Sequence, residues 1–443
     1  MRPALEAGRL DRRRFLLALE RIALGGSFGL LSGCQGKQEV IYVTPRPRVE
    51  VAAATARPQP TEQPTAAPAP TLTPTLPPTE VPTAAPVAHF RTPPLTLATP
   101  RHLHTATLLE SGEILVVGGV DGDRPVATAE LFDRAANGWT PAASLATARY
   151  HHTATRLPGG TILVAGGQDS ALSALDSAER YDPKTDRWEP AAPLATGRAA
   201  HSASLLADGR VLVAGGHNSS ELLASAEVYA PAADTWTGAG AMASVRSGGH
   251  TATLLPDGRV LVVGGFGTRS QAEAELYDPR ADDWAAAGVL ADGRSGHTAT
   301  LLAAGRVLVI GGANSKHGGI YLATAELYEV APNAWVTTEP APGPRLGHTA
   351  TLLPDGQVLV VGGTDGRGPT AAALRYNSAG NTWRPAGALA TARWLHTATP
   401  LLDGRVLVSG GKGDSGSLAE DELYDPATTS WTTTRQSMQW RNT

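Results

Sequence analysis

The sequence predicts an all-β fold, a seven-bladed β-propeller, because three markers recur in register seven times at intervals of 47 to 51 residues. Each copy carries a histidine followed by Thr or Ser, then a pair of glycines, then a tryptophan. The histidines are His104, His152, His201, His250, His297, His348 and His396; the pairs begin at Gly118, Gly166, Gly215, Gly264, Gly311, Gly362 and Gly410; the tryptophans are Trp139, Trp188, Trp236, Trp284, Trp335, Trp383 and Trp431. One four-stranded sheet cannot bury both of its faces, whereas seven packed around an axis can.

The fourth copy shows how one unit is expected to fold. Residues 250–255 form a β-type run, and Asp257 with the glycine after it supplies a hairpin turn. The continuously apolar run 260–263 suits a strand that neighbouring blades cover on both faces. Residues 274–277 alternate as a third strand, and Trp284 opens the fourth. Each copy therefore accounts for one complete propeller blade.

Paired glycines followed by a tyrosine and then a tryptophan, at a period near 50 residues, resemble the kelch repeat. The resemblance covers about three quarters of the chain. It implies a seven-bladed kelch-type propeller of the galactose-oxidase-like superfamily over residues 98–443. The tyrosine and tryptophan of each copy are expected to pack between blades, where each buries about 150–250 Å².

The N-terminal segment carries two patterns typical of export. An arginine cluster followed by two apolar residues at 11–16 resembles a twin-arginine motif, and the apolar run 22–33 is too short to span a bilayer permanently. That run ends in Leu-Ser-Gly before Cys34, which resembles the lipobox of bacterial lipoproteins. The resemblance implies that residues 1–33 are a signal peptide and that Cys34 carries the lipid. The general secretory route is the alternative to twin-arginine export, because Glu20 and Arg21 interrupt the apolar region.

Residues 34–97 are expected to form a lipid-anchored, proline-rich linker. Fifteen of the 34 prolines lie between Pro45 and Pro100, and the run 58–86 consists largely of Pro, Thr, Ala, Gln and Glu. Such a composition buries too little apolar surface to offset the entropy lost on ordering. We therefore predict a disordered stalk that displays the propeller, residues 98–443, outside a bacterial membrane, in the cell envelope or periplasm.

Charge and cysteine content restrict the partners of the chain. The net charge of −4 provides no basic excess for binding nucleic acid. Cys34 is the only cysteine, so the propeller has no disulfide, thiolate nucleophile or thiolate metal ligand. We expect a monomer that contacts the membrane through its lipid alone and uses no metal or cofactor.

The sequence leaves the closure of the last blade open. Each copy supplies four strands of its own, but Phe90 precedes Arg101 by nearly the spacing that separates each tryptophan from the next arginine. A strand at 90–97 is therefore expected to pair into the last blade, beside or in place of the strand that begins at Trp431.

Residues that recur in every copy are expected to build the ring. The repeated histidines would lie too far apart around an axis to share one ion, so we assign them to hydrogen bonds between strands or blades. Repeated glutamates are expected to be satisfied carboxylates within the frame; they are Glu130, Glu179, Glu227, Glu275, Glu326 and Glu422. The sixth copy has Leu374 at this position.

A repeated arginine precedes the first strand of each blade, as in Arg101, Arg149 and Arg393. Because strands alternate in direction, the loop entering the first strand and the loop between the second and third strands emerge on one face. The arginines and the variable loops are therefore expected to share a rim. In eukaryotic kelch substrate adaptors that face binds acidic peptides, so the resemblance implies an anionic ligand at these three arginines. The alternative is that each arginine pairs with a carbonyl or carboxylate of the frame.

The short spacer between each arginine and the next repeated histidine differs among blades. It is small or plain in copies three to six and bulky in copies seven, one and two, which contain Trp394, His102, and Tyr150 with His151. These three blades are contiguous once the ring closes. We predict an aromatic and imidazole wall at the axis that binds a sugar or an anionic glycan. The alternative is that these side chains fill gaps between blades.

The sequence favours a binding module over an enzyme. The copper-radical chemistry of galactose-oxidase-like proteins needs a tyrosine cross-linked to a cysteine, and the propeller has no cysteine. No nucleophile elbow, phosphate loop or HExxH motif is present. We expect the loop-bearing rim to bind a glycan or protein. A cofactor-free, mutarotase-like enzyme acting on sugars and a structural envelope scaffold are the alternatives.

Overall fold

The structure is a computed structural model that describes residues 96–315 and 319–433. The predicted signal peptide, Cys34 and almost all of the predicted linker lie outside these residues. Within the described ranges, no helix has the length and apolarity needed to cross a bilayer.

Seven antiparallel four-stranded sheets make up the described part of the chain, one from each sequence repeat. Blade 1 contains β1 (Thr105–Leu108), β2 (Ile114–Val117), β5 (Ala129–Asp133) and β6 (Gly138–Ala142); blade 2 contains β7 (Thr153–Arg156), β8 (Ile162–Ala165), β9 (Ala178–Asp182) and β10 (Arg187–Ala191). Blade 3 contains β11 (Ser202–Leu205), β12 (Val211–Ala214), β13 (Ser225–Ala230) and β14 (Thr235–Ala241); blade 4 contains β15 (Thr251–Leu254), β16 (Val260–Val263), β17 (Glu273–Asp278) and β18 (Asp283–Val289).

The remaining three blades repeat the same strand order. Blade 5 contains β19 (Thr298–Leu301), β20 (Val307–Ile310), β23 (Ala325–Glu329) and β24 (Ala334–Thr337); blade 6 contains β25 (Thr349–Leu352), β26 (Val358–Val361), β27 (Ala372–Asn377) and β28 (Thr382–Ala388). Blade 7 contains β29 (Thr397–Pro400), β30 (Val406–Ser409), β33 (Asp421–Asp425) and β34 (Ser430–Thr433). Three loops add small ribbons: β3 (Val120–Asp121) with β4 (Arg124–Pro125), β21 (Ala313–Asn314) with β22 (Ile320–Tyr321), and β31 (Lys412–Gly413) with β32 (Gly416–Ser417).

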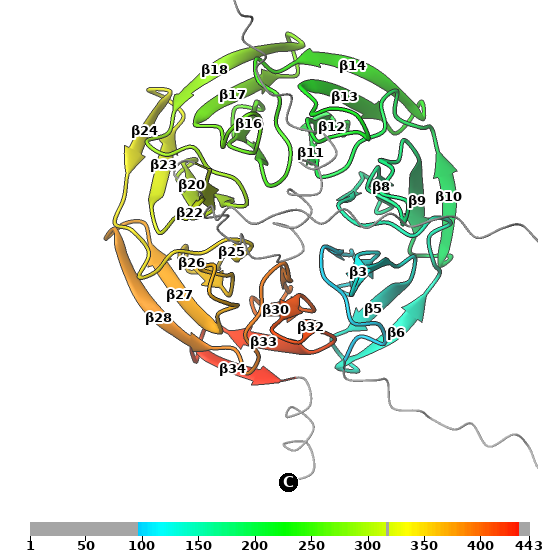
Figure 1. Cartoon of the computed structure of the whole chain (residues 1–443). Helices are drawn as coiled ribbons and strands as arrows, with labels where there is room; N and C mark the ends of the chain where they lie inside the picture. The colour runs from blue at the N-terminus through cyan, green and yellow to red at the C-terminus, as the bar shows by residue number, and fades with distance from the viewer. Residues whose placement is uncertain (1–95, 316–318, 434–443) are drawn as a thin grey trace, which may run out of the picture. The chain divides into compact units, whose positions relative to one another are not determined.

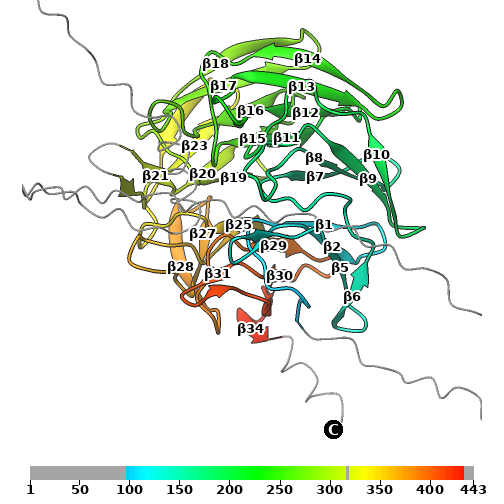
Figure 2. The same ribbon diagram turned by 45° about the vertical axis from the view of Figure 1, so that its right-hand side comes forward.

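The blades follow one another around a central axis and close into a ring (Figure 1). The first strand of each blade lies innermost and contacts the first strands of both neighbours, and β29 contacts β1 to complete the circle. Figure 2 shows β7, β11, β15 and β19 succeeding one another along the inner side. The predicted all-β, seven-bladed propeller is confirmed.

The second strand of each blade forms the core because both of its faces are covered. All seven second strands are buried along their whole length. In β16, Val260 and Val262 pack against blade 3, whereas Leu261 and Val263 pack against blade 5. A continuous apolar run rather than an alternating one is what two covered faces require.

The repeated tyrosine and tryptophan join neighbouring blades, as predicted. In blade 4 the rings of Tyr277 and Trp284 lie 5.2 Å apart, and the Tyr277 hydroxyl donates to Asp282 at 2.8 Å. The indole Nε1 of Trp284 donates to the carbonyl oxygen of Ala239 in blade 3 at 2.8 Å. One side chain therefore contributes both apolar area and a directed bond to the interface.

Blade 7 closes the ring with its own fourth strand, and the N-terminal segment adds a short contact. Trp431 lies in β34, which pairs with β33. The Leu97 amide donates to the Ala419 carbonyl at 3.0 Å, and Leu97 is buried in the core between blades 7 and 1. The part of the predicted 90–97 strand before residue 96 lies outside the described residues.

Candidate functional site

The propeller has two faces with different connections. The loop face carries the loops that enter each first strand and the loops between second and third strands; the latter are 118–128, 166–177, 215–224, 264–272, 311–324, 362–371 and 410–420. The turn face carries the tight turns between first and second strands and between third and fourth strands. The two faces follow from the alternating strand direction within each blade.

The repeated arginines lie inside the frame. In blade 4, Arg246 is fully buried; it donates to Glu275 at 2.7 Å and to the carbonyl oxygen of Gly264 at 2.9 Å. Equivalent arginine–glutamate pairs occur in five further blades; they are Arg101–Glu130, Arg149–Glu179, Arg198–Glu227, Arg294–Glu326 and Arg393–Glu422. Each guanidinium connects the loop that enters the first strand to the end of the second strand and to the third strand of the same blade.

Arg101, Arg149 and Arg393 match the alternative that each arginine pairs within the frame, and ligand binding by them stays a prediction. All three are 0% exposed. Their charge is already used by a buried carboxylate, and a buried pair of this kind costs several kcal/mol per ion in desolvation that only close pairing offsets. The repeated glutamates are satisfied carboxylates, as predicted.

Blade 6 shows how the frame adapts when the glutamate is missing. Elsewhere the glutamate also accepts a loop amide, as Glu275 does from Ala243 at 2.6 Å. Blade 6 has Leu374 in place of the glutamate, and the residue aligned with Ala243 is Pro342, which has no amide hydrogen to satisfy. Arg345 keeps only long bonds to backbone carbonyls, and burial lowers the pKa of its guanidinium to about 10.

The repeated histidines link adjacent blades, which confirms the structural prediction. His297 in blade 5 shares a 3.0 Å hydrogen bond between its Nε2 and the Oγ1 of Thr251 in blade 4. The same bond recurs around the ring except at His250, which bonds the Ala214 carbonyl because Ser202 stands where other blades have threonine. Burial lowers the pKa of all seven imidazoles, which keeps them neutral.

The first glycine of each pair permits this packing. Gly264 has φ of +64°, and a Cβ there would come within 2.5 Å of the Arg294 carbonyl oxygen and 2.6 Å of the His297 ring. A side chain at this position would push the next blade away.

The predicted aromatic wall is mostly enclosed. Trp394 is 6% exposed, Tyr150 4% and His102 0%, whereas His151 is only partly buried. Each of the three enclosed residues forms a backbone bridge to the residue that follows the paired glycines, and Trp394 pairs in this way with Lys412. The loop between second and third strands therefore lies over the spacer. The burial matches the alternative that Trp394, Tyr150 and His102 fill gaps, and binding by these four residues stays a prediction.

A chain of backbone hydrogen bonds connects spacers around the axis. The Leu395 amide donates to the Gly347 carbonyl at 2.8 Å, and the Gly347 amide donates to the Gly296 carbonyl at 3.2 Å. Ala200 bonds His151 in the same way at 2.9 Å. The axial backbone is thus held between blades, and the side chains on it differ from blade to blade.

Sequence reasoning missed His217, which joins His102 and His151 on the loop face. The Nδ1 of His217 bonds the Ser247 hydroxyl at 2.9 Å, and the Nδ1 of His102 bonds the Ser417 hydroxyl at 3.0 Å. Burial, and then the nearby His217 and His102, lower the pKa of His151 to about 3. We call these three residues the axial imidazole cluster. Each is an unrepeated histidine in a spacer or directly after a glycine pair, which is the signal that could have found His217.

The axial imidazole cluster is suited to hydrogen bonding rather than to charge. Burial, followed by the charge of Lys412, lowers the pKa of His102 to about 4, and burial also lowers the pKa of His217. Neutral imidazole offers one donor and one acceptor nitrogen, which can pair with hydroxyl or amide groups. Among residues 96–315 and 319–433, no group of three or more His, Cys, Asp or Glu is arranged to hold a metal ion.

Comparison with known proteins agrees with this architecture. The KLHDC2/KLHL20/DRC7 Kelch-repeats domain matches residues 103–312. Residues 103–312 are kelch repeats, and they form part of a seven-bladed propeller. Kelch propellers are in general protein-binding modules. No curated protein sequence matches the chain significantly.

Among solved structures, a similar one is a fungal alcohol oxidase of the AA5 family in complex with copper. It shares 18% identity with this kelch propeller, with a TM-score of 0.59, and the match covers 72% of each chain. A likeness at this identity shows the fold alone. The described part of this kelch propeller contains no cysteine for a copper-radical cofactor of the galactose-oxidase type.

Proposed function

We propose that this chain is a binding module that recognises a protein or a glycan through its loop face. The observation that carries the proposal is the contrast between repeated and unrepeated side chains. The repeated Arg, Glu, His and Trp residues are used inside the frame, whereas the axial imidazole cluster occupies blades 1, 2 and 3 only. Glycines stand at the corresponding spacers of blades 4, 5 and 6.

The chemistry of this face favours a neutral, hydrogen-bonding ligand surface. Its imidazoles are uncharged near neutral pH; His151 and His217 are partly exposed, whereas His102 and the repeated arginines are enclosed. Hydroxyls of a glycan or amides of a peptide pair with neutral imidazole and with serine hydroxyls. Leu172 and Ile320, in two of the loops on this face, are 45% and 48% exposed and supply apolar contact area.

We further propose that the propeller works outside the cytoplasm, as a monomer anchored by a lipid on Cys34. The support for this is the sequence pattern before Cys34 and the proline-rich composition of residues 34–97. Mass spectrometry of the protein from a membrane fraction tests it. A diacylglyceryl group on Cys34 is the expected result, and an unmodified Cys34 would contradict the anchor.

We favour binding over catalysis because of the imidazole pKa values. A sugar-acting enzyme without a cofactor needs an acid or base whose pKa lies near the working pH. Burial lowers the pKa of His151 to about 3 and that of His102 to about 4. Such groups are weak bases at neutral pH, but they remain good hydrogen-bonding partners.

The test is a calorimetric titration of the full chain with neutral and anionic oligosaccharides. His151→Ala removes a partly exposed imidazole, and Gln357→Ala on the turn face is the matched control. We expect saturable binding that weakens roughly tenfold in His151→Ala, the size of one good hydrogen bond, and is unchanged in the control. Equal binding by all three proteins would contradict a site at the axis. Trp394→Ala is less informative because Trp394 is enclosed and contacts the blade 6 spacer.

A further inference from the structure

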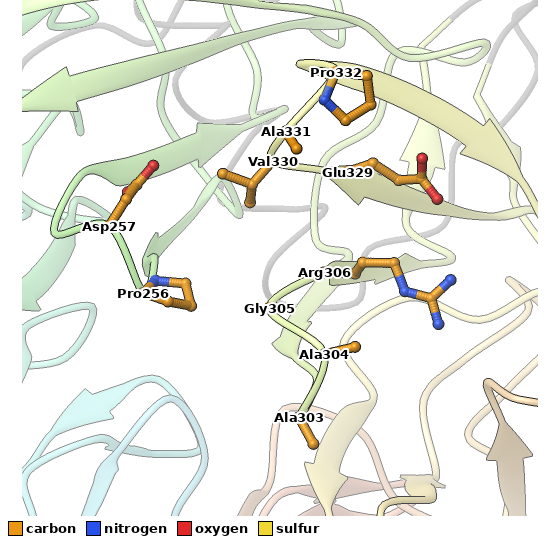
Figure 3. Close-up of a pocket in the computed structure, with 10 residues that line it drawn as sticks. All are labelled: Pro256, Asp257, Ala303, Ala304, Gly305, Arg306, Glu329, Val330, Ala331 and Pro332. Carbon is orange, nitrogen blue, oxygen red and sulfur yellow. The ribbon is translucent and has the colours of Figure 1, made fainter.

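A hollow of about 600 Å³ lies on the turn face between blades 4 and 5 (Figure 3). Its walls are the first turn of blade 4, the first turn of blade 5 and the second turn of blade 5; the lining residues are Pro256, Asp257, Ala303, Ala304, Gly305, Arg306, Glu329, Val330, Ala331 and Pro332. A neighbouring hollow between blades 5 and 6 shares Ala303, Ala304 and Arg306. Arg306 therefore stands where the two hollows meet.

The first turn of blade 5 lacks a carboxylate that other blades have. Three blades carry Asp-Gly-Arg in this turn, and the aspartate pairs with the arginine two residues later; the pairs are Asp208–Arg210, Asp257–Arg259 and Asp403–Arg405. In blade 5 the sequence is Ala304-Gly305-Arg306. Within the described ranges, the guanidinium of Arg306 forms no hydrogen bond and no ion pair, although Arg306 is partly buried.

The second turn of blade 5 also departs from the repeat. In five of the other six blades an Asp or Asn opens this turn and its Oδ1 accepts the amide two residues on, whereas blade 3 has Ala230; the five are Asp133, Asp182, Asp278, Asn377 and Asp425. Blade 5 has Glu329, one methylene longer, and its carboxylate makes no such bond in the part of the chain that the structure describes. Figure 3 shows the side chains of Arg306 and Glu329 extending in the same direction, away from Pro256 and Asp257.

Apart from Asp257, which is paired with Arg259, the rest of the hollow is small and apolar. Ala303, Ala304, Val330, Ala331 and Pro332 form its wall beside the two charged groups. Blade 5 thus presents one cation, Arg306, and one anion, Glu329, that lack the partners found in other blades. Next to an apolar surface, these two charges suit a peptide segment that carries both charges beside small side chains. A charge-assisted hydrogen bond to carboxylate is among the stronger contacts available to arginine.

We propose that this hollow binds a segment of a partner protein in which an acidic side chain pairs with Arg306 and a nearby basic side chain pairs with Glu329. The two charges select for a mixed-charge peptide: Glu329 repels a segment with acidic residues only, and Arg306 repels one with basic residues only. The site is on the face opposite the loop face, so the proposal is independent of the proposed function.

The experiment measures binding of the capped peptide acetyl-Ala-Glu-Ala-Lys-amide to the full chain by NMR or calorimetry. Ala304→Asp is the decisive variant, because it restores the aspartate of the other blades and satisfies Arg306 internally without removing it. Arg306→Gln removes the cation. We expect either change to weaken binding roughly tenfold, as the loss of one charge-assisted bond implies.

Arg405→Gln is the matched control, because Arg405 is paired with Asp403 within the same turn of blade 7, outside the hollow, and its loss should leave the affinity unchanged. A peptide with glutamine in place of glutamate should bind as weakly as Arg306→Gln does. The proposal is overturned if the wild-type chain does not bind the mixed-charge peptide, or if Ala304→Asp binds it as tightly as wild type. Folding is checked by the melting temperature, which Ala304→Asp should not lower, because Asp is the residue at this position in four other blades.

Discussion

The interior of the blades and the loop face differ in how they use similar side chains. Inside the frame, arginine, glutamate and histidine recur in nearly every blade, and each has a defined partner in its own or the next blade. Among the described residues of the loop face, unrepeated histidines occur in blades 1, 2 and 3, and His102 and His217 bond serines that do not repeat. The recurrence of a polar side chain among the blades therefore indicates its role in this propeller. Seven copies of a residue indicate the frame, and one copy indicates a site.

Lowering the pH should destabilise the interior of the blades, and we expect this loss of folding stability to be the largest of the effects. Burial lowers the pKa of His152 and His348 to about 3 and that of His250 to about 4, whereas histidine in an unfolded chain titrates near 6.5. Between these values the unfolded chain binds more protons than the folded one. Stability is therefore full above about pH 6.5 and is lost as the pH falls towards 4. Urea denaturation at pH 7.5 and 5 should differ by several kcal/mol, and equal midpoints would contradict the neutral, buried histidines.

Removing one frame carboxylate should have the next largest effect. Glu275→Leu copies the blade 6 residue into blade 4 and leaves Arg246 buried without its carboxylate, which should cost about 3–5 kcal/mol in urea denaturation. Adding Ala243→Pro removes the amide that Glu275 had accepted, so the double variant should lose less than the sum of the single changes. A cost below about 1 kcal/mol for Glu275→Leu would show that these pairs matter little to the frame.

The interface between blades 7 and 1 should show a smaller, pH-dependent effect. Trp139 donates to Asp421 at 2.6 Å, whereas the other six tryptophans donate to backbone carbonyls. Burial raises the pKa of Asp421 to about 8, so the folded protein holds a proton there that the unfolded chain releases above about pH 4. This contribution to stability is present at low pH and is lost as the pH rises towards 8.

Asp421→Asn keeps an acceptor for Trp139 but cannot ionise. We expect it to be more stable than wild type at pH 9 and nearly equal to it at pH 4, as measured by thermal denaturation. Asp421→Ala, the residue of most other blades at this position, should lose about 1–3 kcal/mol because the indole nitrogen is left without a partner. A pH-independent difference between Asp421→Asn and wild type would contradict the protonated aspartate.

The smallest effect on stability should come from the loop face. His151 is partly exposed and outside the repeated network, so His151→Ala should change the free energy of unfolding by less than about 0.5 kcal/mol. Chemical denaturation at pH 7.5 checks this. A loss as large as that of Glu275→Leu would place His151 in the frame and remove the contrast between the two regions.

Much of the frame could be predicted from the sequence because its signals are local. The apolar run 260–263 is the whole of β16, and the third strand predicted at 274–277 extends by one residue at each end in β17. The repeated Trp and His pack and bond between blades, as their spacing suggested. The sequence alone did not decide whether Arg246 is buried, because only the pairing of the strands shows that Glu275 faces it.

The candidate site could be predicted less well, because it depends on how loops fold over the axis. The backbone bridge between Trp394 and Lys412 encloses the indole, and no local pattern marks that bridge. His217 lies in the loop after a glycine pair, and no local pattern in that loop indicates its hydrogen bond to Ser247. Asp421 stands where the other blades have alanine. Its carboxylate accepts a hydrogen bond from Trp139, and this could not be predicted because Trp139 lies far away in the sequence.

We propose that unrepeated residues of the loop face bind the ligand while the repeated interior builds the ring. The most direct test is hydrogen–deuterium exchange of the full chain with and without the tightest-binding oligosaccharide from an array of neutral and anionic glycans. We predict protection in the loops 215–224 and 410–420 and in the spacers that hold His102 and His151. Protection confined to the turn face, or an array without any bound glycan, would contradict a glycan site at the axis.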